Sequence, residues 1–169
     1  MKKFFAITFI LTSLFLSTQH AEAQAKFGYV SSQELITAMP DFKKADTSLK
    51  EFEVALNGQY EEMVQDFRVR DSLLRSKDTL KYTKAQLELK HRELAQLYQK
   101  VQGWQQEAGR IYQNRQQELM TPIYDKARKV IADVAKENGY TYVFTKEQLL
   151  SFPPGDDLLP LIKKKLNLK

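Results

Sequence analysis

The sequence contains no cysteine and few residues that interrupt regular structure. Its 169 residues include two histidines, six glycines and five prolines. Without cysteine the chain cannot form disulfides, thiolate metal sites or a cysteine nucleophile. His20 and His91 lie far apart in the sequence, which argues against a histidine zinc site and a Ser-His-Asp triad. The scarcity of glycine and proline disfavours a loop-rich all-β fold.

No motif typical of catalysis occurs. The chain lacks the glycine-rich motifs that cradle nucleotide phosphates. The paired carboxylates Glu61-Glu62 and Asp156-Asp157 lie in charged segments typical of a solvated helix face or cap. We therefore expect no enzymatic activity, no cofactor and no metal.

The N-terminus has the pattern of a secretory signal peptide. Two lysines precede an apolar run at positions 4–16, and the A-x-A sequences at 21–23 and 23–25 follow. A run of 13 residues is short for a helix that crosses a bilayer, which argues against the alternative of a membrane anchor. We expect residues 1–23 to be removed by cleavage after Ala23 or Ala25, and the mature chain to reach the periplasm.

Two apolar stripes with helical spacing predict a long antiparallel hairpin at residues 41–121. The first stripe comprises Phe42, Ala45, Leu49, Phe52, Leu56, Tyr60, Met63, Phe67 and Leu74. The second comprises Leu94, Leu97, Val101, Trp104, Ala108 and Ile111. Ser, Asp and Thr at 76–79 favour a turn, so the tip is predicted there.

Folding about Asp78 would place Phe52 opposite Trp104 and Phe67 opposite Leu89. A register shifted by one heptad also pairs many apolar residues, and the turn residues favour Asp78. The alternative is one continuous helix in an intermolecular coiled coil, which the mid-chain turn residues disfavour.

Residues 24–40 and 122–169 are predicted to form a small body around the base of this hairpin. Strands are expected near 27–30 and 140–145, with a third short strand at 149–152. The return helix should kink at Pro122 and stop at Asn138-Gly139, and a last helix should cover 158–166. The predicted fold class is α+β, mostly α.

The body is too small for a sizeable core of its own, so we expect it to form oligomers. The expected interface residues are the apolar and aromatic residues of the two strands. They are Phe27, Tyr29, Val30, Tyr140, Tyr142 and Phe144.

The order of these features resembles the Skp/OmpH family of periplasmic chaperones. The matching segments are the opening KFGYVSSQELITAMP, the hairpin, LMTPIYDKARKVIADVAKENGYTYVFT and the closing DDLLPLIKKKLN. The resemblance implies a homotrimer whose helical tentacles enclose a cavity and hold unfolded outer-membrane proteins without ATP. The start of the closing helix departs from the family pattern at Asp156 to Pro160.

The basic excess of the chain is concentrated near the predicted tip. The whole chain has a net charge of +5, and residues 67–92 alone carry eight basic and three acidic residues. We interpret the tip as a surface that steers acidic clients or contacts an anionic membrane, the alternative being an ordinary solvated turn. The residues assigned to it are Arg68, Arg70, Arg75, Lys77, Lys81 and Lys84.

Two further sets of residues are candidates for client handling. Tyr98 and Tyr112 lie off the strict stripe, so they either face a client or pack within the hairpin. Gly58, Gly103 and Gly109 lie inside the predicted helices and are either hinges or tolerated substitutions.

The sequence thus favours a chaperone that holds unfolded outer-membrane proteins. A non-chaperone coiled-coil scaffold of the envelope is the alternative. The basic composition also fits a nucleic-acid-binding protein, which the signal peptide argues against, so we expect no nucleic acid as a partner.

Overall fold

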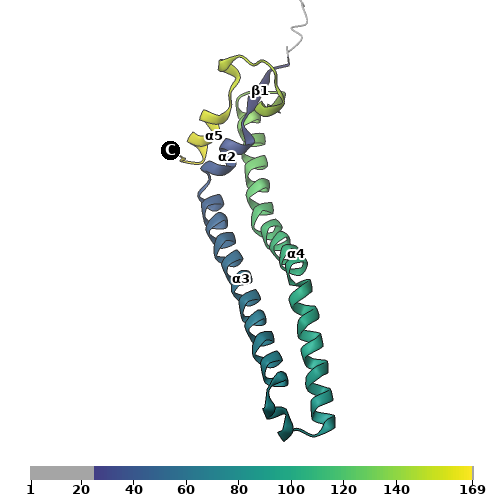
Figure 1. The fold of residues 1–169 in the computed structure, drawn as a ribbon. Coiled ribbons are helices and arrows are strands. Elements are labelled where there is room, and N and C mark those ends of the chain that lie inside the picture. The colour runs from purple at the N-terminus through teal and green to yellow at the C-terminus, as the bar shows by residue number, and fades with distance from the viewer. Residues whose placement is uncertain (1–24, 169) are drawn as a thin grey trace, which may run out of the picture.

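Two long helices form a hairpin that projects from a small body of short elements (Figure 1). The computed structural model describes residues 25–168, and for Lys77 and Asp78 it describes the backbone alone. The predicted signal peptide at residues 1–23 lies outside the described residues. The predicted fold, a mostly helical α+β chain with a long hairpin, is confirmed.

The arms of the hairpin are α3 (Pro40–Arg75) and α4 (Lys84–Glu137). At about 1.5 Å per residue, α3 is about 54 Å long and α4 about 81 Å, so α4 extends beyond α3 into the body. Pro40 occupies the start of α3, where its missing N–H would have no helical partner. Pro122 lies inside α4 without ending it.

The outer part of the hairpin is thinly packed. On α3 the buried residues are Ala45, Leu49 and Leu56, and on α4 burial begins at Met120. Among the described side chains at positions 57–119 none is fully buried. The apolar stripes therefore lie between the arms but remain partly open to solvent.

The tip is a longer turn than the sequence suggested. The 3₁₀ turn η1 (Lys77–Lys81) follows α3, and Thr83 caps α4. Thr83 Oγ1 accepts a bond from the Gln86 N–H at 3.3 Å, and Gln86 Oε1 accepts from the Thr83 N–H at 2.8 Å. This reciprocal capping box fixes the first residue of α4.

The predicted pairing of the arms is wrong, because partners on the return arm lie later in the sequence than predicted. The Trp104 indole N–H donates to the Leu56 carbonyl at 3.3 Å, one turn beyond the predicted partner Phe52. The Phe67 ring lies against Tyr98, with centroids 5.8 Å apart, instead of against Leu89. In both contacts the shift has the direction that a longer turn produces.

The body is built on a two-stranded parallel sheet. The strand β1 (Phe27–Val30) pairs with β2 (Tyr142–Thr145) in a register that places Tyr29 beside Phe144. Ser31 caps α2 (Ser32–Ala38) by accepting from the Glu34 N–H. The hydrophobic core joins β1, α2 and both arms to α5 (Leu159–Lys165). Its residues are Val30, Leu35, Met39, Ala45, Met120, Ile123, Ala127, Val130, Val134, Ala135, Leu158, Leu159 and Ile162.

The third short strand predicted at 149–152 is absent from the described structure. The chain passes from η2 (Lys146–Gln148) to η3 (Pro154–Asp156), and only Asp157 forms a bridge, to Tyr29. Pro153 and Pro154 lack the N–H groups with which a strand could continue beyond Phe152, and the Phe152 ring packs on Tyr29. The side chain of Asp157 then caps α5, because its Oδ1 accepts from the Leu159 N–H at 2.9 Å.

Gly28 lets β1 approach the last helix closely. A Cβ there would overlap Leu158 Cδ1 and lie 2.8 Å from the Tyr140 ring. Because Leu158 is fully buried, it has no room to move away. We expect Gly28→Ala to lower the free energy of unfolding by about 1–3 kcal/mol, measured by urea denaturation. Gly155→Ala, where the added Cβ meets nothing within 4 Å, is the control and should unfold like the wild type.

The capping box predicts a local effect at the tip. Thr83→Ala should cost about 1 kcal/mol in the first turn of α4, since it leaves the Gln86 N–H without its acceptor. Amide hydrogen exchange should then be about fivefold faster in that turn. Thr47→Ala, which removes a bond to the Lys43 carbonyl inside α3, is the matched control. Equal exchange in both variants would contradict the assigned role of Thr83.

Candidate binding surfaces

One face of the sheet presents an exposed aromatic cluster. Phe27, Tyr142 and Phe144 are 51 %, 56 % and 43 % exposed, and we call them the outer sheet face. The ring of Phe27 lies 5.5 Å from that of Tyr142 and 6.1 Å from that of Phe144. In this sheet β2 is paired along one side only. Exposed aromatic rings beside an unpaired strand edge are typical of a surface that another chain covers.

The other predicted interface residues of the body are less exposed. Tyr29 and Val30 are buried, and the Tyr29 ring packs against Phe152 with centroids 4.7 Å apart. Burial raises the pKa of the Tyr29 phenol. Tyr140 is partly buried beneath the Lys26 ammonium, which lies 3.9 Å from its ring centroid. The fold thus divides the predicted set between the core and the surface, and the contact with Phe152 accounts for the burial of Tyr29.

The basic residues near the tip differ in their partners. Arg70 Nε donates to Asp66 at 2.7 Å, and its Nη1 lies 3.8 Å from Glu93 on the other arm. This hydrogen bond and the charge of Asp66 raise the pKa of Arg70. Arg75 is held by an aspartate one turn earlier, at position 71. The side chain of Lys77 lies outside the described residues.

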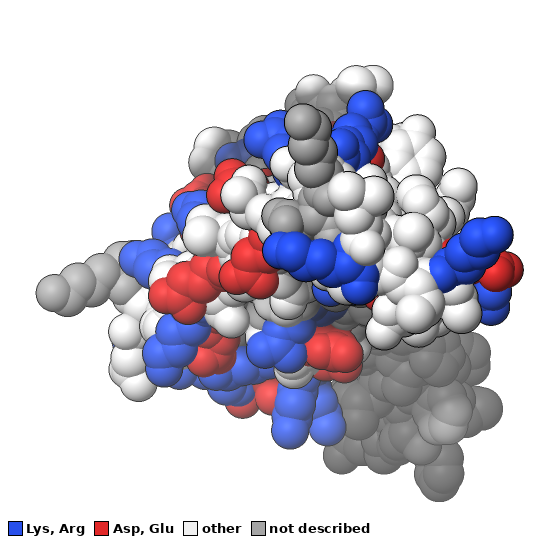
Figure 2. All heavy atoms as spheres, turned by 60° about the horizontal axis from the view of Figure 1, so that its bottom comes forward, with Lys and Arg blue, Asp and Glu red and all other residues white. Residues whose placement is uncertain are grey.

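Arg68 and Lys84 are exposed and form no ion pair with a described residue. Figure 2 turns the tip toward the viewer and shows lysine and arginine side chains interspersed with acidic ones. The tip is therefore a net basic surface with mixed charges rather than a continuous basic cap.

A cavity of about 610 Å³ lies between the arms near the middle of α3, and we call it the mid-arm cavity. Its apolar walls are formed mainly by Leu56, Tyr60, Val101, Trp104, Ala108 and Tyr112. The bond from Trp104 to the Leu56 carbonyl crosses from one arm to the other at this level. Of the two tyrosines predicted to handle clients, Tyr112 lines this cavity, while Tyr98 packs on Phe67 and is 45 % exposed.

The three glycines within the arms occupy open space. A Cβ at Gly58, Gly103 or Gly109 would meet nothing within 4 Å. Packing therefore does not demand glycine at these positions. Their role as hinges stays a prediction.

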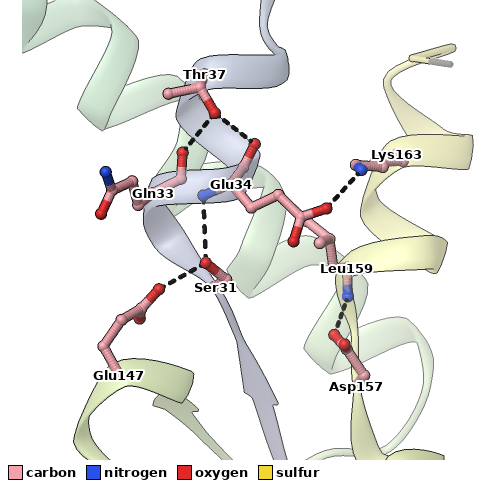
Figure 3. A network of polar contacts seen from close by, with 8 residues as sticks. All are labelled: Ser31, Gln33, Glu34, Thr37, Glu147, Asp157, Leu159 and Lys163. Atoms are coloured by element: carbon pink, nitrogen blue, oxygen red, sulfur yellow. Dashed lines mark hydrogen bonds and ion pairs between the residues drawn. The ribbon is translucent and has the colours of Figure 1, made fainter.

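A polar network joins α2 and its cap Ser31 to Glu147 and to α5 within the body (Figure 3). Ser31 Oγ donates to Glu147 Oε1 at 2.5 Å while it accepts from the Glu34 N–H at 3.2 Å. The Glu34 carboxylate in turn pairs with the Lys163 ammonium of α5 at 2.9 Å. The bond from Ser31 holds the pKa of Glu147 below its ordinary value. We interpret this network as structural, since it joins β1, α2, the segment after β2 and α5.

Sequence reasoning missed several of these features. The Thr83-x-x-Gln86 pattern is a capping-box signal that marks the start of α4. The bond between Ser31 and Glu147 joins residues 116 positions apart, and no local sequence pattern predicts it.

Among the described side chains, no group of histidines and acidic residues is placed to hold a metal ion. None of the helices in the described part is long and apolar enough to cross a membrane.

Comparison with known proteins decides the family. The family model for outer membrane protein (OmpH-like) matches residues 26–166, which include the body and both arms. The chain belongs to the OmpH-like family. The resemblance drawn from the sequence is thereby confirmed.

A solved structure shares the fold of this OmpH-like protein. It is that of a candidate outer membrane chaperone (OmpH-like) from Caulobacter crescentus CB15, with 18 % sequence identity and a TM-score of 0.66. The match covers 89 % of each chain. No curated protein matches the sequence at a significant level. Family membership supports a chaperone role at the level of the family.

The polar network predicts a dependence of stability on pH. Because the folded state lowers the pKa of Glu147, its carboxylate stabilises the fold above the ordinary value of 4.5 and loses this effect as the pH falls through the lowered value. The melting temperature of the wild type should therefore fall more steeply below about pH 4.5 than that of Glu147→Gln. Glu61→Gln, which removes an exposed carboxylate on α3, should keep the slope of the wild type. Identical slopes for Glu147→Gln and the wild type would contradict the prediction.

Proposed function

We propose that this OmpH-like protein is an ATP-independent periplasmic holdase that binds unfolded outer-membrane proteins and prevents their aggregation. The observation that carries the proposal is the outer part of the hairpin, where apolar residues line two long arms yet none of the described side chains at 57–119 is fully buried. Such a surface offers many weak apolar contacts to a chain that has not folded. The family match supports the same role.

The working form is a homotrimer. The outer sheet face and the free edge of β2 supply an apolar surface that a second copy can cover by adding a strand. Three copies joined through their bodies would hold their hairpins side by side around one cavity. Contacts from three hairpins would add up to tight capture, although each contact is weak and exchanges readily.

Capture requires no energy source in this mechanism. A client enclosed between the hairpins cannot pair its strand edges with those of another client, so aggregation is delayed. Release follows when the client buries its own apolar surface in the membrane. The predicted signal peptide and the family match support a periplasmic location.

Native mass spectrometry with an unfolded outer-membrane porin tests the proposal. We expect the protein by itself to be a trimer and to form a trimer–client complex after mixing. We also expect the diluted porin to scatter less light in its presence than in its absence. A trimer that forms no complex and leaves the scattering unchanged would favour the envelope scaffold instead. A monomer without client would contradict both the assembly and the function.

The outer sheet face predicts a way to break the trimer. Tyr142→Glu combined with Phe144→Glu places two charges in the proposed interface, and burying an unpaired charge is costly. The double variant should dissociate to monomers at concentrations where the wild type stays trimeric, as judged by analytical ultracentrifugation. Tyr124→Glu is the matched control, because Tyr124 is 41 % exposed on α4 and lies outside the outer sheet face. A trimeric double variant would refute this interface.

The basic tip predicts electrostatic steering of acidic clients. Arg68→Glu with Lys84→Glu should slow the capture of an acidic porin roughly threefold to tenfold at low salt, and the difference should vanish at high salt. Lys136→Glu with Lys164→Glu changes the net charge equally at the body and serves as the control. Stopped-flow fluorescence measures the rates, and unchanged rates in the tip variant would exclude steering.

Sedimentation with vesicles rich in anionic lipid tests the proposed membrane contact of the same residues.

A further inference from the structure

We propose, on the basis of the holdase function above, that the mid-arm cavity binds an aromatic side chain of an extended client segment that carries lysine or arginine beside it. This cavity lies within one hairpin, between α3 and α4, and is distinct from the space enclosed by three hairpins. Each subunit would then grip a client through its own site.

The walls of the cavity suit an aromatic ring. Tyr60, Trp104 and Tyr112 line it from both arms. The Trp104 indole is already fixed by its bond to the Leu56 carbonyl, so it offers a positioned stacking surface. Offset or edge-to-face contact between aromatic rings is worth about 0.5–1.5 kcal/mol beyond the burial of apolar area. Three such rings around one cavity therefore favour an aromatic guest over an aliphatic one.

Small residues keep the cavity open. Ala108 and Gly109 lie where α4 lines it, and a Cβ at Gly109 would meet nothing within 4 Å. Asn57, Gln102 and Gln105 also line it, and their amides can donate to and accept from an extended backbone. A client segment would thus find partners for its peptide groups as well as for its ring.

The charges around the cavity select basic neighbours. Glu53 is the only charged residue that lines the cavity within the described part of the chain. Its carboxylate forms no ion pair with a described residue. Residues 41–66 carry seven acidic and three basic residues, so the field on this arm is negative. Lysine or arginine beside the guest ring would be attracted, and aspartate or glutamate repelled.

Trp104 makes the site directly observable, because it is the only tryptophan of the chain. The probes are three capped pentapeptides without tryptophan or tyrosine: phenylalanine flanked by arginines, phenylalanine flanked by glutamates, and alanine flanked by arginines. We expect a saturable change in Trp104 fluorescence with the first peptide, and affinities at least about tenfold weaker for the other two. Equal binding of the alanine peptide would show attraction by charge alone and overturn the proposal.

Two substitutions of glycine on α4 give a matched pair. Gly109→Leu fills the cavity, and Gly103→Leu adds the same side chain at a position that does not line it. Leucine favours the helix in both cases, so both variants should fold. Calorimetric titration with the arginine–phenylalanine peptide should show about tenfold weaker binding for Gly109→Leu and unchanged binding for Gly103→Leu. Glu53→Gln should weaken binding chiefly at low salt. Equal affinity of the two leucine variants would refute the site.

The outcome separates this site from the holdase function. Suppression of porin aggregation without any effect of the peptides on Trp104 would overturn the site and leave the function standing. Saturable, cavity-dependent binding of the peptide by a protein that does not suppress aggregation would support the site and contradict the function.

Discussion

The packing of the last turns of α4 into the body is the interaction on which the whole molecule depends. Met120, Ile123, Ala127, Val130 and Val134 form the buried face that meets α2, α5 and the sheet. The arms have no comparable core of their own, so the hairpin is held from one end. A protein built this way can leave the apolar stripe of its arms open to solvent, because its stability is supplied elsewhere.

The sequence revealed the hairpin and its approximate turn but not the register of its arms. A heptad stripe such as that of Phe52 and Leu56 pairs nearly as well after a shift of one repeat, so apolar spacing alone cannot choose. The choice is made at the tip by the Thr83–Gln86 cap, a local signal outside the stripe. At 149–152 the apolar residues suggested a strand, but the prolines that follow and the need of Asp157 to reach both Tyr29 and α5 leave no strand there.

The candidate surfaces were predictable to different degrees. Strand alternation places Phe27 and Tyr29 on the same face of β1, but only the fold shows that Phe152 packs on Tyr29 while Phe27 stays exposed. The mid-arm cavity depends on the register and on contacts such as that between Trp104 and Leu56, so no sequence pattern indicates it. The sequence alone was enough to locate the basic residues near the tip, whereas their ion pairs are visible only in the three-dimensional structure.

The unbroken course of α4 makes it a lever with its fulcrum in the body. A tilt of one degree where α4 leaves the body near Met120 displaces the start of the helix, about 54 Å away, by about 1 Å. Small adjustments in the packing of the body are thus amplified into larger displacements of the tip of the hairpin. By the same geometry, a displacement imposed at the tip would reach the packing of the body.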